Sequence, residues 1–305
     1  MFKFSVYQSI AFRNRIFHSV RFKSNSQEKY IPKVVTRKAQ VIEPEPPNKF
    51  RRRLWITGAL AVYSFTAYGV YLYKDLTRED GKTPNVPIDV SDRYDRIAKN
   101  FDLDVDLTEK ITGINWLRSR MTKRAHGDVL EVCAGTGRNS PYYQLDKCKS
   151  VTMVDNSTEM LKIAKQHFHD TQPEYKKCKF ISQSALKPIQ PASESGFDTI
   201  LQTMGLCSTP EPSELLVRLG SLVKPETGQI LLLEHGRSYY DWLNRTLDKT
   251  APAHADKYGC WWNRDIAKIV EDSGLEIVKI KRYHLGTTWW IELKPSKTAA
   301  TSGEK

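Results

Sequence analysis

The sequence lacks the cysteine pattern of a zinc site or a disulfide framework. It has five cysteines, an odd number, and no two of them have Cys-x-x-Cys spacing. Structural zinc sites need closely spaced ligand pairs, and disulfide-rich domains usually carry an even set of cysteines. We therefore expect five free thiols and no metal site.

Most of the chain also lacks an excess of charge of either sign. Residues 1–53 hold 13 Lys/Arg and 3 Asp/Glu, whereas residues 54–305 hold 34 and 32. The overall net charge of +12 therefore belongs to the N-terminal arm. Because domains that bind nucleic acids usually carry a basic surface, we expect no nucleic-acid partner for the rest of the chain.

The first 27 residues contain no acidic residue. Arg13, Arg15 and Arg21 are interleaved there with serines and with aromatic and aliphatic residues. This composition is typical of a mitochondrial transit peptide, and the alternative is a disordered basic tail. Residues 28–53 are polar and basic, with the proline-rich stretch Glu43–Pro47, and we interpret them as a linker.

Residues 54–73 contain no charged residue. A helix of this length, at about 1.5 Å per residue, matches the thickness of a bilayer core. Arg51–Arg53 precede it, and Trp55 and Tyr73 stand near its ends. We predict a single transmembrane helix in the inner mitochondrial membrane, with a buried core helix as the alternative. The preceding arginines favour a soluble domain in the intermembrane space.

A linker with Pro84 and Pro87 covers residues 74–89, and the domain that follows covers residues 90–293. Residues 107–121 show apolar side chains at helical spacing, which predicts one helix laid against a sheet. Buried strands are predicted at 129–132, 150–154, 179–182, within 196–205, before Glu234, at 275–280 and at 288–293. A helix is predicted to start near Arg138, and residues 294–305 are predicted to be a disordered tail.

The segment Asp128–Asn139 joins a predicted strand to a turn of small residues. Gly135 and Gly137 allow positive φ and close approach of a ligand, as at strand ends of doubly wound sheets. Asp155 ends the next strand, where a carboxylate can bind ribose hydroxyls. Two alternatives are a tight turn without a ligand and a dinucleotide-binding loop, although Ser140 replaces the third glycine of the latter.

The segment resembles motif I of class I S-adenosylmethionine-dependent methyltransferases, an acidic residue followed by Gly-x-Gly-x-Gly. Leu222-Val-Lys-Pro-Glu-Thr-Gly-Gln resembles the turn that leads into their fifth strand, and Tyr94-Asp95 with Phe101-Asp102 resembles the UbiE-type branch. The plan of the chain is similar to membrane-anchored mitochondrial methyltransferase-like proteins of fungi. The resemblance implies an α/β, Rossmann-like seven-stranded sheet, mostly parallel with an antiparallel last strand.

The same resemblance implies S-adenosylmethionine as cofactor and a set of residues that bind it. These residues are Glu131, Cys133, Gly135, Gly137, Asp155, Asn156, Ser184, Ala185 and Thr203. Cys133 replaces the first glycine of the motif, and Ser184 stands where the family often has Asp. His235, at the end of the fifth strand, is the candidate general base, with a hydrogen-bonded loop histidine as the alternative.

The function that these features predict is methyl transfer to a small or lipophilic acceptor at the inner mitochondrial membrane. The departures at Cys133 and Ser184 keep a second hypothesis open. In it, the fold is retained without catalysis and serves the assembly or stability of an inner-membrane protein complex.

Overall fold

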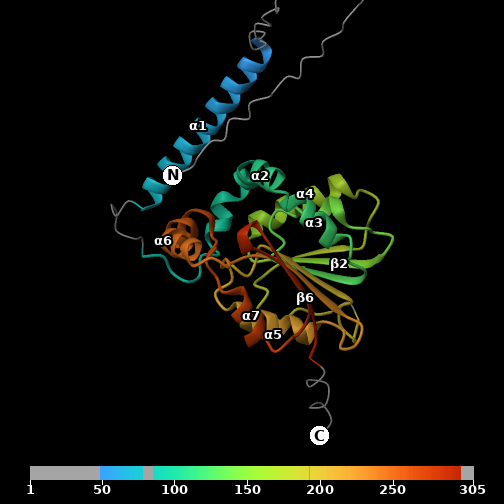
Figure 1. Cartoon of the computed structure of the whole chain (residues 1–305). Coiled ribbons are helices and arrows are strands. Elements are labelled where there is room, and N and C mark those ends of the chain that lie inside the picture. Colours follow the sequence, from blue (N-terminus) through green and yellow to red (C-terminus); the bar gives the residue numbers. More distant parts are fainter. Residues whose placement is uncertain (1–48, 78–84, 192, 297–305) are drawn as a thin grey trace, which may run out of the picture. The chain divides into compact units, whose positions relative to one another are not determined.

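The computed structural model describes residues 49–77, 85–191 and 193–296 (Figure 1). The predicted transit peptide, most of the linker that follows it and residues 297–305 of the predicted tail lie outside the described residues. Lys294 belongs to the last strand, so the folded part ends slightly later than the predicted boundary at residue 293.

Helix α1 (Lys49–Thr77) forms where the uncharged stretch predicts a helix. Thr57 and Thr66 donate their hydroxyls to backbone carbonyls three or four residues earlier in the same helix, at 2.8–3.0 Å. Among the described residues, no helix combines the length and the apolar character that crossing a membrane requires. The predicted transmembrane span at 54–73 is not supported by this finding; threonine, serine and tyrosine hydroxyls dilute its apolar residues.

A seven-stranded sheet with the order β3-β2-β1-β4-β5-β7-β6 forms the centre of the domain. The strands are β1 (Gly127–Val132), β2 (Cys148–Asp155), β3 (Cys178–Ser182), β4 (Thr199–Thr203), β5 (Gln229–His235), β6 (Glu276–Tyr283) and β7 (Thr288–Lys294). The first five strands pair in parallel, and β7 pairs antiparallel with both β5 and β6. The predicted Rossmann-like sheet with an antiparallel last strand is confirmed.

Both faces of the central strands are buried, as their long apolar runs require. Leu130 and Val132 face one side, with α5 (Pro212–Leu222) and α7 (Ile266–Asp272). Val129 faces the other side, with α3 (Ile114–Thr122) and α4 (Thr158–Thr171). Figure 1 shows these helix pairs on opposite sides of the sheet.

The predicted helix at 107–121 is instead two helices. α2 (Arg93–Thr112) ends at Gly113, whose φ of 76° reverses the chain into α3. Leu107 and Ile111 of α2 are exposed, so the expected continuous apolar face does not exist. α6 (Asp241–Tyr258) lies beside α2, and η2 (His284–Gly286) joins the last two strands.

The predicted helix start near Arg138 is wrong. The segment between β1 and β2, which is fully described, contains turns and only the three-residue 3-10 helix η1 (Ser140–Tyr142). Asn139 and Ser140 favour turns, and Pro141 stands in the first turn of η1, where its missing N–H leaves no hydrogen bond unmade. The chain nevertheless returns to form β2 parallel to β1.

Candidate functional site

The order in which the chain adds parallel strands reverses at β1. β2 and β3 lie on one side of it, and β4 and β5 lie on the other. Ligands of doubly wound sheets bind at the carboxyl ends of the strands at such a switch point. A cavity of about 340 Å³ lies here, within the size range of small-molecule sites. Seven residues predicted to bind the cofactor line it: Cys133, Gly135, Asp155, Asn156, Ser184, Ala185 and Thr203.

The glycine loop at the end of β1 takes the backbone conformations expected of it. Gly135 and Gly137 have φ of 55° and 76°, and Cys133 adopts a positive φ of 52° although it is not glycine. A Cβ on Gly135 would meet no protein atom within 4 Å, so this position leaves open space toward the cavity. A Cβ on Gly137 would lie 3.0 Å from Cα of Ala164, so Gly137 serves helix packing and does not line the cavity.

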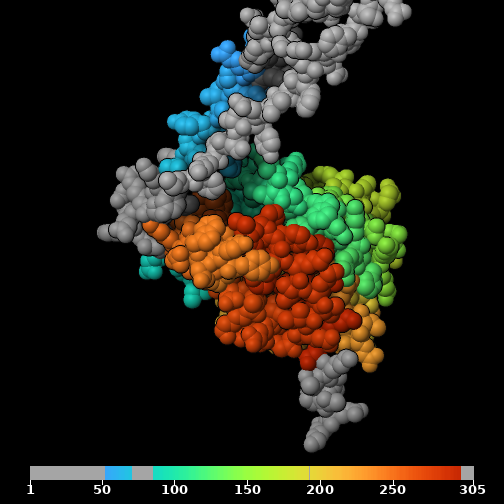
Figure 2. Space-filling model, in the orientation of Figure 1, coloured from blue at the N-terminus to red at the C-terminus, as the bar shows by residue number. Residues whose placement is uncertain are grey.

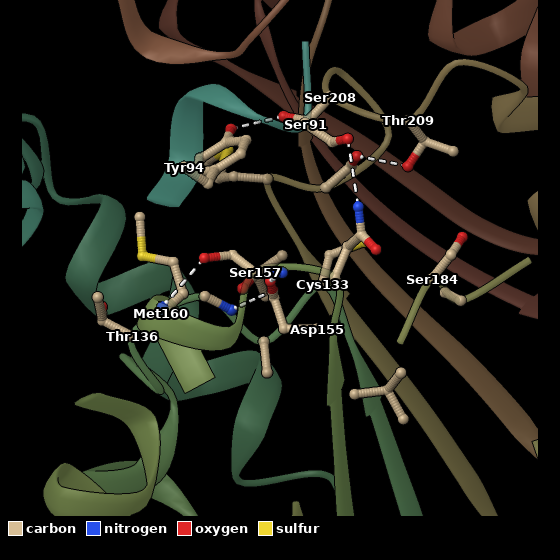
Figure 3. Close-up of a pocket in the computed structure, with 18 of the residues that line it drawn as sticks. Ser91, Tyr94, Cys133, Thr136, Asp155, Ser157, Met160, Ser184, Ser208 and Thr209 are labelled. Atoms are coloured by element: carbon tan, nitrogen blue, oxygen red, sulfur yellow. Dashed lines mark hydrogen bonds between the residues drawn. The ribbon is translucent and has the colours of Figure 1, made fainter. Parts of the chain in front are cut away.

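Asp155 stands at the end of β2, on the wall of the cavity (Figure 3). Its Oδ2 accepts a hydrogen bond from the Gly135 N–H at 2.7 Å, and its Oδ1 accepts one from the Ser157 N–H at 2.8 Å. Burial raises the pKa of Asp155 above its ordinary value. Each carboxylate oxygen has a second lone pair, so the side chain keeps acceptors for ligand hydroxyls.

Glu131 is not among the residues that line the cavity, so the geometry does not support its predicted direct contact with a ligand. Its Oε1 accepts from Asn139 Nδ2 at 2.8 Å and its Oε2 accepts from the Tyr143 hydroxyl at 2.5 Å. Burial raises the pKa of Glu131 to about 7. The carboxylate therefore acts beneath the glycine loop, where it holds the side chains that support the loop.

A buried ionic network, which the sequence analysis missed, forms one wall of the cavity. Arg118 of α3 donates to Thr203 at 2.6 Å, Asn139 at 3.1 Å and Glu109 of α2 at 2.8 Å. Arg138 also donates to Glu109, at 2.9 Å. Burial alone would raise the pKa of Glu109, but the two guanidinium groups outweigh it and lower that pKa. No local sequence motif signals these pairs, because they join three separate elements.

Other parts of the cavity wall carry hydroxyl groups. Ser184 lines the cavity and accepts from the Leu186 N–H at 3.2 Å through its Oγ. Tyr94 and Ser208 also line the cavity, and their oxygens lie 2.6 Å apart (Figure 3). The Tyr94 hydroxyl donates to the carbonyl of Gly259 at 3.2 Å, which ties α2 to the end of α6.

His235 ends β5, as predicted, but it does not line the cavity. Its Nδ1 lies 4.0 Å from Sγ of Cys260. Burial lowers the pKa of His235 to about 4, so the ring is neutral near pH 7. The geometry therefore does not support the predicted role as general base.

The cavity suits the cofactor that the sequence resemblance implies. It offers a carboxylate on one strand end, an open glycine position and hydroxyl acceptors, all within one enclosed site. Burial also raises the pKa of the Cys133 thiol, so this thiol is protonated near pH 7 and adds no charge to the wall.

Comparison with known proteins gives a family match over most of the domain. Residues 111–280 match the methyltransferase domain family. The chain is 37% identical over 218 residues to the mitochondrial methyltransferase OMS1 of Saccharomyces cerevisiae; the match covers 68% of this chain but 46% of the yeast protein. It is 25% identical over 228 residues to the demethylmenaquinone methyltransferase of Chlamydia pneumoniae, covering 65% of this chain and 94% of that protein.

Solved structures with similar folds include a complex of DhpI with SAH. The similarity has a TM-score of 0.48 and 16% sequence identity, and it covers 69% of this chain and 97% of that one. The family match confirms the resemblance that the glycine loop and the turn before β5 indicated.

Proposed function

The chain belongs to the methyltransferase domain family, and on this premise we propose that it transfers a methyl group from S-adenosylmethionine to a small, lipophilic acceptor. The observation that carries the proposal is the pairing of Asp155 with the glycine loop at the mouth of β1 and β2. This pairing places a carboxylate beside an open glycine position in an enclosed cavity.

The residues have distinct roles in holding the cofactor. Asp155 accepts from the ribose hydroxyls, and Gly135 allows the cofactor to approach the loop backbone. Ser184 accepts from the adenine amino group through its hydroxyl oxygen. Arg118 and Glu109 keep Thr203 and α2 in place along the opposite wall.

Methyl transfer from a sulfonium does not require a strong general acid or base in the protein. S-adenosylmethionine, when bound, supplies a methyl group on a sulfonium, which is a strong electrophile. The protein therefore contributes mainly by orienting the acceptor and excluding water. Tyr94 and Ser208, which line the cavity and share a hydrogen bond, are the polar groups that we propose position the acceptor.

A mitochondrial location is part of the proposal. The yeast relative is described as mitochondrial, and the first 27 residues of this chain contain no acidic residue. Association with the inner membrane belongs to the same proposal. The acceptor is to be sought among quinol-like phenols and alkyl thiols, with methylated product as the readout.

Isothermal titration calorimetry of the full chain with S-adenosylhomocysteine tests the proposal. We expect binding, and we expect Asp155→Ala to weaken it by about tenfold or more, because hydrogen bonds to a charged group contribute about 1.5–3 kcal/mol. Asp170→Ala, which removes an exposed carboxylate on α4 outside the cavity lining, serves as the matched control. Unchanged affinity in Asp155→Ala would remove this residue from the ribose site. Absence of binding by the native chain would favour the assembly hypothesis.

A further inference from the structure

Helix α2 has its polar and apolar faces reversed relative to an ordinary surface helix. Its carboxylates Asp102 and Glu109 point inward to Arg138. Its outward stripe consists of Leu103, Leu107 and Ile111, which are 81%, 67% and 76% exposed. A surface helix normally buries such a stripe, and clustered exposed apolar residues mark interaction sites.

The stripe continues onto neighbouring elements. The ring Nε2 of His284 lies 2.8 Å from the carbonyl oxygen of Thr112, so η2 adjoins the end of α2. Leu285 of η2 is exposed, and its carbonyl accepts from the Ser238 hydroxyl at 2.5 Å. Figure 2 shows α6, in orange, beside the red C-terminal segments on this face. We define the outer patch as Leu103, Leu107, Ile111, Tyr239, Trp242 and Leu285, all exposed.

Four exposed cations flank the outer patch. On α6, Arg245 and Lys249 follow Trp242 at spacings of three and seven residues, so they share its outward face. On α2, Arg96 and Lys99 precede Leu103 on the same stripe. None of the four forms an ion pair with any residue that the structure describes. The combination of aliphatic, aromatic and cationic side chains is typical of surfaces that lie on a membrane.

We propose that the outer patch docks the domain on the surface of an anionic phospholipid bilayer. This inference rests on the proposed methyl transfer to a lipophilic acceptor. Anionic headgroups would neutralise the flanking cations. A second copy would bring the same cation-flanked patch, whereas the bilayer surface supplies anionic charge, so a bilayer is the better partner.

The outer patch and the cavity lie on opposite faces of the same helix, α2. Phe101 and Glu109, on the inner face of α2, line the cavity, whereas Leu103 and Leu107 lie on its outer face. Only one helix therefore separates the docked surface from the cavity. Docking would therefore hold the cavity close to the bilayer that contains a lipophilic acceptor.

Flotation of the full chain with phospholipid vesicles tests the patch. Leu103→Ser/Leu107→Ser should lower the partition coefficient by about tenfold or more, because two exposed leucines lose their burial in lipid. The matched control is Val217→Ser/Ile277→Ser, whose side chains on α5 and β6 are 51% and 50% exposed. Arg245→Gln/Lys249→Gln should remove the gain in binding that phosphatidylserine gives over phosphatidylcholine. Equal binding by the leucine variant and its control would overturn the proposal.

A local readout separates the outer patch from α1, which also exposes apolar side chains. Brominated phosphatidylcholine should quench Trp242 emission, measured as the difference between the native chain and Trp242→Phe. Trp262→Phe, which removes a ring stacked 3.9 Å from that of His254, is the control. A chain that floats without quenching of Trp242 would overturn the docking. Concentration-dependent dimerisation of the native chain that the leucine variant abolishes would also overturn the docking, because the patch would then bind a second copy of the chain.

The two proposals fail in different ways. S-adenosylhomocysteine binding, measured by calorimetry in the leucine variant, reports folding and an intact cavity independently of vesicles. A chain that docks on vesicles but binds no S-adenosylhomocysteine refutes the proposed function alone. A chain that binds S-adenosylhomocysteine but does not dock refutes the outer-patch proposal alone.

Discussion

Replacing Glu131 by Gln should make the protein more stable at alkaline pH relative to the native chain. Glu131 is fully buried, and no cation among the described residues forms an ion pair with it; its carboxylate accepts from Asn139 and Tyr143. The amide of Gln fits the same place, because its oxygen can accept from Asn139 while its nitrogen donates to the Tyr143 hydroxyl. The substitution therefore removes the ionisation and keeps the hydrogen bonds.

The size of the effect follows from the raised pKa of Glu131. In the unfolded chain this carboxyl has a pKa of about 4.5, and in the folded chain burial raises the pKa to about 7. Between these values the folded state holds a proton that the unfolded state has lost, so stability falls as pH rises through this window. The full difference corresponds to about 3 kcal/mol, present below pH 4.5 and lost above pH 7.

Urea denaturation at several pH values from 4 to 8 measures the effect as a difference between the two chains. Taking the difference cancels the contributions of all other titrating groups. We expect the native chain to lose about 3 kcal/mol relative to Glu131→Gln across this range. Parallel curves, with a change below about 1 kcal/mol, would refute the reasoning that burial dominates this site.

Three further outcomes are expected. Glu109→Gln should lower the free energy of unfolding by about 3–5 kcal/mol in urea denaturation, because it leaves the buried charge of Arg118 without its carboxylate; a loss under 1 kcal/mol would contradict this. Gly137→Ala should destabilise by about 1–3 kcal/mol, since its Cβ would press on Ala164 at positive φ, and an unchanged thermal midpoint would count against the contact. His235→Ala should change turnover by less than about threefold, because general-base help is typically about 100-fold or more and the ring lies outside the cavity; a larger loss at unchanged cofactor affinity would restore its catalytic role.

The sequence predicts the sheet well because its strands are long apolar runs at regular intervals. The residues at strand ends are also predictable, since Cys133, Asp155 and Thr203 all reach the cavity. The orientation of Glu131 could have been deduced from strand parity. It shares its side of β1 with Val129, which faces α3 and α4, so its side chain points beneath the loop.

Other features required knowledge of which distant residues meet. The apolar spacing of Leu107 and Ile111 predicts a buried face, but the inner face of α2 is held by charges instead. Arg138 follows the glycine loop and Glu109 lies on α2, so nothing local in the sequence links them. Gly113 ends α2 by its positive φ, and a continuous helical pattern conceals that break.

The irregular chain after the glycine loop has a consequence for which nucleotide the site selects. Dinucleotide-binding loops place the pyrophosphate at the first turn of an α-helix, whose aligned N–H groups favour negative charge. Here the fully described stretch after Gly137 has only the three-residue η1, so that source of positive potential is missing. A ligand with a sulfonium and no phosphate does not need a helix N-terminus at this place. The glycine loop itself therefore offers a pyrophosphate no helix N-terminus.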